Sequence, residues 1–266
     1  MTSGNTPEHN VMGLMDHLRE LRKRLLFSAI FVTLGGFAAY YYATEIFFVL
    51  CAPYYQAFAD SPLIGTSPTE AWVLKLKVSI FAGCLLTSPL LFHQLWLFIA
   101  PGLYESERRY VIPFVLLSSI LFCGGAWFCY DAVLPVTLSF FFNEFASINI
   151  SPTIKLADHL SMTITLLVAF GLVFELPLLT LFLTRMGVID HHFLLRYFKH
   201  AIVVIFITAA VLTPPDVITQ FLMAGPLIVL YVISVAIAYL ASPSRANVEA
   251  HQTITEKQLD QTSTTR

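Results

Sequence analysis

The chain has 266 residues, of which 57% are hydrophobic and only 12% are charged, and its mean hydropathy is +0.73. An ordinary water-soluble domain carries about 25% charged residues, so this composition excludes that class of protein. The apolar residues form long runs separated by short charged clusters, a pattern typical of membrane-spanning helices of roughly 20 residues. We therefore predict an all-α, polytopic membrane protein. The net charge of -2 identifies no partner, because the placement of the charges matters more than their sum.

The N-terminal part is predicted to be a polar segment followed by an amphipathic helix. Residues 1–13 are mostly polar, and we expect them to be disordered. Over residues 14–24, leucines recur at helical spacing while acidic and basic residues occupy the other faces. This helix is expected to run directly into a first span at about residues 25–43.

The start of the second span is marked by a short motif. Ser67-Pro68-Thr69-Glu70 has the pattern of a capping box with proline at the first helical position. The pattern predicts a helix over about 68–98, which is longer than the hydrocarbon core requires, with a bend at Pro89. The preceding segment, 45–66, contains an apolar stretch that ends near Pro53 and is too short to span.

Four more spans follow, and the fifth is unusually short. The apolar run from His200 to Leu212 is only about 13 residues long, and a helix of that length covers about 20 Å of a core about 30 Å thick. A mixed segment over 131–160 separates the third span from the fourth, and the polar tail 241–266 is expected to be disordered. The membrane domain is thus predicted over 14–240, with the later spans at about 108–130, 161–183, 199–212 and 217–240.

The distribution of basic residues predicts the orientation. With an N-terminus in the cytoplasm, twelve of the fifteen Lys and Arg residues fall on the cytoplasmic side, and the remaining three on the other. An even number of spans then places the C-terminus in the cytoplasm as well. The three outer residues are Lys75, Lys77 and Lys155.

Motifs of covalent chemistry are not found in the sequence. It contains no HExxH, GxSxG, P-loop or dinucleotide fingerprint, and its four cysteines form no CxxC pair. We therefore expect no enzyme activity, no cofactor, no metal and no nucleic-acid partner.

Glu175 lies within the predicted fourth span. A carboxylate at such depth costs several kcal/mol unless it is protonated, paired or facing water. One interpretation is structural: a neutral carboxyl that hydrogen-bonds to backbone groups freed by Pro177. The other is functional, with Glu175 lining a polar cavity.

Two further carboxylates map to the cytoplasmic membrane surface. Glu20 could simply pair with Lys23 or Arg24 on the next helical turn. Glu107 could simply favour the start of the third span through the helix dipole. Because both lie at the same surface, they could instead bind a pair of guanidinium groups, whose planar forks match carboxylates.

Asp216 and Gln220 lie one turn apart at the start of the sixth span, on the predicted outer side. Asp216 follows two prolines, so it could act as a helix cap, or it could be functional together with Gln220.

Four short motifs follow one another along the chain. They are His17-Leu18-Arg19-Glu20-Leu21-Arg22-Lys23-Arg24, Phe98-Ile99-Ala100-Pro101-Gly102-Leu103-Tyr104 with Glu107-Arg108-Arg109, Phe174-Glu175-Leu176-Pro177, and Leu212-Thr213-Pro214-Pro215-Asp216. Together and in this order they are specific, and they resemble the motifs of the TatC family, whose members are a subunit of the twin-arginine protein translocase. The resemblance covers about residues 14–240, and Pro53 and Pro89 also fall where the family has prolines.

The resemblance implies a curved, concave bundle of six helices in the bacterial inner membrane that binds the paired arginines of signal peptides on folded cargo. The arginine-binding carboxylates would be Glu20 and Glu107, with Arg22 and Phe98 on the same cytoplasmic face. Glu175 would lie inside the concavity. Asp216 and Gln220 would lie at the outer end of the last two spans.

The partners that the resemblance implies are single-span TatA- and TatB-type subunits, further copies of the chain and membrane lipid. The protein would nucleate the translocation complex, with the proton-motive force as energy source. The alternative is a proton-coupled small-molecule transporter with Glu175 and Asp216 as relays. The absence of a convincing internal repeat and the short fifth span disfavour that alternative.

Overall fold

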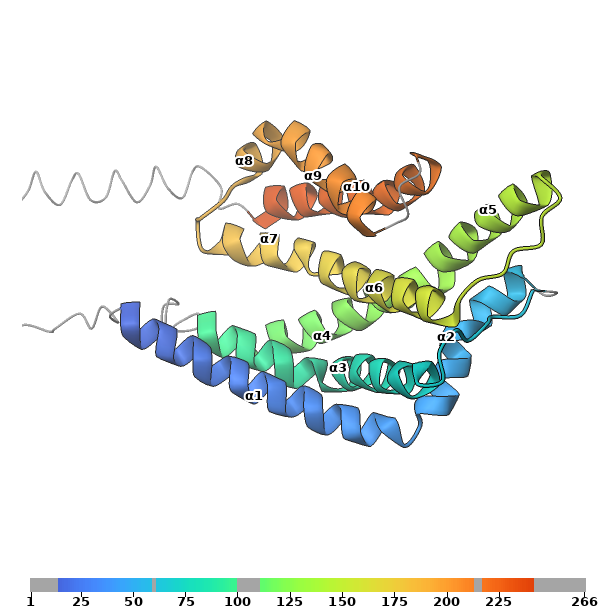
Figure 1. Ribbon diagram of the computed structural model, residues 1–266. Coiled ribbons are helices and arrows are strands. Elements are labelled where there is room, and N and C mark those ends of the chain that lie inside the picture. The colour runs from blue at the N-terminus through green and yellow to red at the C-terminus, as the bar shows by residue number, and fades with distance from the viewer. Residues whose placement is uncertain (1–13, 59–60, 100–110, 213–216, 242–266) are drawn as a thin grey trace, which may run out of the picture. The chain divides into compact units, whose positions relative to one another are not determined.

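The computed structural model describes residues 14–58, 61–99, 111–212 and 217–241 (Figure 1). Within these ranges the regular structure is helical, apart from one isolated bridge between Ile64 and Lys155. The all-α class predicted from composition is confirmed. The helices are α1 (Leu14–Tyr40), α2 (Ala43–Ala57), α3 (Glu70–Ile99), α4 (Val111–Phe128), a π-helix η3 (Cys129–Val133), α5 (Leu134–Ser147), α6 (Leu156–Phe174), α7 (Leu176–Arg185), α8 (His191–Arg196), α9 (Phe198–Leu212) and α10 (Val217–Ala241).

Five helical stretches are long and apolar enough to cross a membrane. A sixth apolar helix, α9, has 15 residues and reaches only about 22 Å at 1.5 Å per residue. The polytopic membrane class follows from these six apolar helices. The five long stretches are Met15–Tyr40, Glu70–Ile99, Val111–Ser147, Leu156–Arg185 and Val217–Ala241.

The helical stretch that begins at Val111 extends beyond the span expected over 108–130. It continues through η3 and α5 to Ser147, because the backbone forms a π turn in which the Leu134 amide donates to the Cys129 carbonyl. The wider turn lies directly before Pro135, whose ring nitrogen has no hydrogen to donate. The helix therefore continues through Pro135 without a break.

Two compact units divide the chain. The first lies within Met1–Cys123 and Leu138–Ile164, and the second within Gly124–Thr137 and Thr165–Arg266.

The first unit is organised around the pair α1 and α3, which run side by side (Figure 1). The two backbones approach closely where glycines meet. A Cβ atom added at Gly83 would overlap the backbone of Gly36, and one added at Gly35 would lie 2.7 Å from the Thr87 methyl carbon. Small residues allow such close helix packing inside membranes, where apolar surface alone gives little drive for association.

Helix α3 contains Pro89 and continues through it. A proline removes the amide that would bond to the carbonyl four residues earlier, here that of Leu85. The Ser88 hydroxyl donates to this Leu85 carbonyl at 2.8 Å, so the acceptor keeps a partner inside the apolar environment.

Glu70 connects the start of α3 to the start of α6. Its Oε2 accepts from the amides of Thr66 at 2.6 Å and Ser67 at 3.1 Å, which is the backbone half of the predicted capping box. Its Oε1 accepts from the Ala157 amide at 2.9 Å, one of the first-turn donors of α6 that have no acceptor within the helix. One buried carboxylate thus caps two helix starts.

Beside this carboxylate, the chain before α3 pairs with the chain before α6. The Ile64 amide donates to the Ile154 carbonyl, and the Leu156 amide donates to the Ile64 carbonyl. An aromatic cluster built on Tyr54 and Phe58 packs against α5 and the end of this segment, with Leu138, Phe141 and Phe145 among its members.

In the second unit, α10 packs against α7, α8 and α9. The Tyr231 hydroxyl of α10 donates to the Leu194 carbonyl of α8 at 2.9 Å. The pair His191-His192 begins α8. Asp190 caps this helix, because its Oδ1 accepts from the Phe193 amide at 2.7 Å.

The glycine contact gives a stability prediction. Gly83→Ala adds a methyl group against the Gly36 backbone, so we expect a loss of about 1–3 kcal/mol despite the better helix propensity of alanine. Gly124→Ala is the matched control, because no atom lies within 4 Å of its added Cβ. Thermal unfolding of the purified proteins in detergent should show a lower midpoint for Gly83→Ala only. Equal midpoints for the two variants would contradict the close contact.

The two-helix cap gives a second prediction. Glu70→Ala leaves three backbone amides without their carboxylate acceptor, so we expect the segment before α3 and its link to α6 to open more often. Limited proteolysis should cut the segment 61–69 faster in this variant than in Glu45→Ala, which removes an exposed carboxylate from the first turn of α2. Identical cleavage rates in the two variants would show that the carboxylate is dispensable.

Candidate functional site

The candidate site is built where the N-terminal turns of α1 meet the C-terminal turns of α3. Arg24 Nη2 donates to Glu20 Oε1 at 3.1 Å, and Arg24 Nη1 donates to Gln94 Oε1 at 3.3 Å. The side chains of Arg24 and Glu20 are only 24% and 19% exposed. Of the two partners that the sequence offered to Glu20, the structure selects Arg24 over Lys23.

Arg24 therefore orients the Glu20 carboxylate. The guanidinium is anchored on the other helix through Gln94, which is buried. A carboxylate can accept several hydrogen bonds over its two oxygens, and Arg24 uses one position on Oε1. Glu20 thus keeps acceptor capacity for a second donor at this end of the helix pair.

An aromatic pair lies on the same faces of α1 and α3. The rings of His17 and Phe98 stack with centroids 4.5 Å apart and an interplanar angle of 26°. His17 precedes Glu20 by three residues and Phe98 follows Gln94 by four, which places each on the face of its neighbour. Phe98 was predicted from the sequence as a site residue, whereas Gln94 was not, and His17 was named only as part of a motif. The helical spacing of these two residues from Phe98 and Glu20 was the available signal.

Arg22 lies elsewhere on α1. Successive residues of an α-helix are about 100° apart, so Arg22 points about 200° away from Glu20. It is exposed and lines a groove with Arg19 and Lys23. The structure thus places Glu20 and Phe98 on the facing sides of α1 and α3, each one turn from a residue that bridges the two helices, and it places Arg22 on another side of α1.

Four predicted residues lie outside the described ranges: Glu107, Pro214, Pro215 and Asp216. The other two predicted prolines are placed inside helices, Pro53 in α2 and Pro89 in α3.

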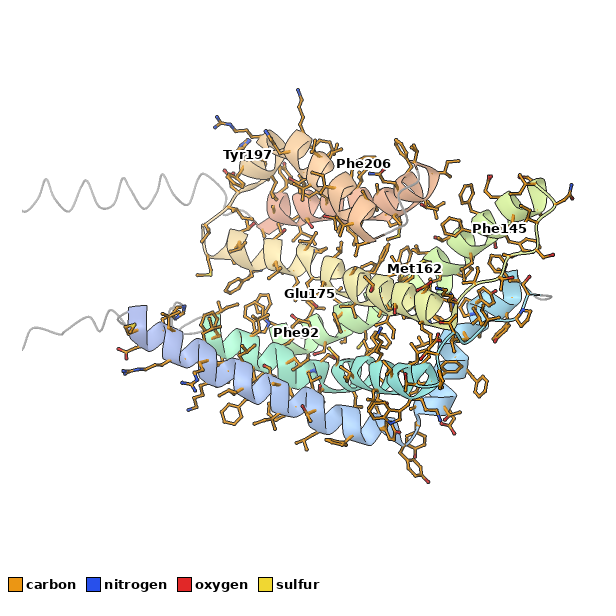
Figure 2. All side chains as sticks on the ribbon, viewed as in Figure 1. Phe92, Phe145, Met162, Glu175, Tyr197 and Phe206 are labelled. Atoms are coloured by element: carbon orange, nitrogen blue, oxygen red, sulfur yellow. The ribbon has the colours of Figure 1, made fainter. Side chains whose placement is uncertain are left out.

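Glu175 lies at the junction of α6 and α7 (Figure 2). It is 6% exposed, and its backbone occupies the N-cap position of α7, directly before Leu176 and Pro177. The Glu175 carbonyl accepts from the Leu179 amide at 2.8 Å, so the new helix begins at this residue. A buried carboxyl at a helix break inside an apolar stretch is an expensive group to retain.

Gln220 connects the last two helices. Its Nε2 donates to the Phe206 carbonyl at 2.9 Å, from α10 to α9. The side chain is half-buried, and Phe206 lies on the facing helix (Figure 2).

The chemistry offered by these groups is recognition of charge. The described ranges contain no cluster of three or more His, Cys, Asp or Glu side chains that could hold a metal ion. An oriented carboxylate beside an aromatic ring suits a guanidinium or ammonium group, which can use a charge-assisted hydrogen bond and the ring face together.

Comparison with known proteins identifies the family. The family model described as "Sec-independent protein translocase protein (TatC)" matches residues 16–226. The chain belongs to the TatC family. It is 42% identical over 221 residues to the Sec-independent protein translocase protein TatC of Desulforapulum autotrophicum, covering 83% of this chain and 82% of the relative. The TatC protein of Campylobacter jejuni is 38% identical over 253 residues, covering 90% and 98%.

The fold comparison agrees. A crystal structure described as twin arginine translocase receptor TatC superposes with a TM-score of 0.77 at 40% identity, covering 85% of this chain and 99% of that chain. A second crystal structure of the receptor, in DDM, superposes with a TM-score of 0.78. The chain is thus a component of the Sec-independent protein translocase, with a role in protein transport, and the resemblance seen in the sequence is confirmed at the level of the family.

Proposed function

We propose that this TatC protein binds the twin-arginine signal peptides of folded cargo at the cytoplasmic face of the bacterial inner membrane, through Glu20 and Glu107, and nucleates a translocation complex driven by the proton-motive force. The observation that carries the proposal is the Glu20 carboxylate, which Arg24 orients one helical turn from the stacked rings of His17 and Phe98. The description of the structural relative as the receptor of the twin arginine translocase supports it.

The physical case rests on an oriented acceptor. Glu20 is partly buried, so a bound guanidinium would interact with it in a medium of lower effective dielectric than bulk water. Arg24 is a positioning residue in this scheme, because it fixes the carboxylate without contacting the peptide. The stacked rings of His17 and Phe98 offer an apolar and cation-binding surface next to the charge.

Glu107 is the second carboxylate of the proposed pair. It follows Phe98 by nine residues in the chain, and Glu20 follows His17 by three, so each acidic residue comes shortly after one member of the aromatic pair. Two carboxylates would give the site a preference for two consecutive arginines over two lysines, since only guanidinium presents a planar fork.

The remaining predicted residues are proposed to serve assembly. Glu175, Asp216 and Gln220 would contact the single-span TatA- and TatB-type partners or further copies of this chain, with both termini in the cytoplasm. Gln220 already bridges α9 and α10, so a partner there would meet a preformed helix pair.

The signal-peptide site can be tested by binding. Glu20→Ala and Arg24→Gln should each weaken binding of a labelled twin-arginine peptide about tenfold or more, because each breaks a partly buried charged pair. Glu144→Ala, which removes an exposed carboxylate from α5, is the control. Fluorescence anisotropy with purified protein, and with a twin-lysine peptide for comparison, gives the affinities.

The same peptide-binding measurements test whether Glu20 and Glu107 form one site. The double variant Glu20→Ala/Glu107→Ala should lose less than the sum of the single losses if the residues form one site. Wild-type affinity in both single variants would refute the assignment.

Glu175 is tested by transport. Glu175→Gln preserves shape and hydrogen-bonding capacity and should retain much of the export of a twin-arginine reporter, whereas Glu175→Ala should lose more. Membrane insertion and binding of the signal peptide should survive in both variants, because the residue is remote in sequence from Glu20 and Phe98. Normal export by the Glu175→Ala variant would show that this carboxyl has no role in transport and would contradict the assignment.

A further inference from the structure

A separate face of α1 combines cations with an apolar stripe. Arg19, Arg22 and Lys23 line a groove with a cavity volume of about 510 Å³. The other lining residues follow one to two helical turns along the same helix, and they are Leu26, Phe27 and Ile30.

This face is distinct from the proposed peptide site. Glu20 and Arg24 are half-buried beside Gln94, whereas the three cations of the groove are exposed. Arg22 lies about 200° around the helix from Glu20, so a ligand held by Arg22 lies away from the Glu20 carboxylate. Lys23, three residues after Glu20, lies at the edge of the groove nearest to that carboxylate.

The groove carries an excess of positive charge. Arg19 pairs with Asp16 at 3.4 Å, but this pair is weak because the two side chains are 81% and 61% exposed. Arg22 and Lys23 form no ion pair with any residue that the structure describes. Glu20, the other nearby acid, is already bound to Arg24.

The order of the groups along α1 matches one class of ligand. Eight residues separate Arg22 from Ile30, or about 12 Å of helix, so the groove passes from cationic to apolar as a bilayer passes from phosphate to acyl chain. Arg presents a fork that suits phosphate, and Lys adds a point charge. A peptide carrying two arginines would be repelled by this face, and a zwitterionic lipid would bring its own cation with its phosphate.

We propose that this groove binds an anionic phospholipid, with the lipid phosphate on Arg19, Arg22 and Lys23 and the upper acyl chain against Leu26, Phe27 and Ile30. Juxtamembrane basic clusters attract anionic lipids in general, and the apolar floor adds a site for one chain. The proposal goes beyond peptide recognition and assigns the basic half of the α1 entry motif a ligand of its own.

Lipid preference of the purified full chain tests the proposal. Native mass spectrometry measures how much phosphatidylglycerol and how much phosphatidylcholine bind to the wild-type protein and to the triple variant Arg19→Gln/Arg22→Gln/Lys23→Gln. We expect the preference for phosphatidylglycerol to fall about tenfold or more. The triple variant Arg185→Gln/Arg196→Gln/Lys199→Gln removes the same number of exposed Arg and Lys charges elsewhere and should keep the wild-type preference. An equal effect of the two triple variants would overturn the proposal, as would full competition by inorganic phosphate.

A crosslinking measurement avoids any effect of the substitutions on folding. A photoreactive amino acid at Ile30 should crosslink phosphatidylglycerol in preference to phosphatidylcholine, and Lys23→Gln should reduce that preference. The same probe at Phe37, an exposed residue of α1 outside the groove, should show no preference. Equal labelling at both positions would refute the site. Glu20→Ala should leave the preference at Ile30 intact, so failure of the lipid proposal and failure of the peptide proposal give different results.

Discussion

The contact between the backbones of Gly36 and Gly83 sets the register of the helix pair on which the candidate site is built. Because α1 and α3 run in opposite directions, residues at equal distances from this contact face each other. Arg24 lies twelve residues before Gly36, and Gln94 lies eleven residues after Gly83, which correspond to about 18 Å and about 17 Å of helix. The bond between Arg24 and Gln94 is therefore a geometric consequence of a glycine contact several turns away.

Carboxylates in this chain occupy two different kinds of environment. Glu70 accepts only from neutral donors, three backbone amides and a hydroxyl, so it acts as a cap shared by two helices. Glu20 shares its charge with Arg24, which leaves it oriented but not saturated. The difference separates a carboxylate that completes the fold from one that can accept a ligand. Burial alone would not have distinguished them, since both side chains are largely covered.

The sequence predicted those features that local chemistry determines. Composition and run length gave the membrane class, and the Ser67-Pro68-Thr69-Glu70 pattern placed the start of α3 within two residues. Features that depend on pairing between distant segments were not predictable in this way. Glu20 had two local candidates for a partner, and the choice of Arg24 depended on Gln94, seventy residues further along the chain. The second role of Glu70, as acceptor for the Ala157 amide, likewise depends on a residue that is 87 positions away in the sequence.

The π turn of η3 has a consequence for how the helix around it is interpreted. It places one extra residue in the turn, and one residue corresponds to about 100° of rotation. A helical wheel drawn for an unbroken α-helix from Val111 to Ser147 therefore assigns residues before Cys129 to the correct face of the helix. Residues after Val133 are assigned to a face that is wrong by about 100°. Leu138 and Phe141, which pack in the Tyr54 and Phe58 cluster, both lie on the part of the helix that follows this phase shift. Insertions or deletions of one residue at this point among homologous chains would accordingly change which side of α5 is covered, while leaving its length and hydropathy almost unaltered.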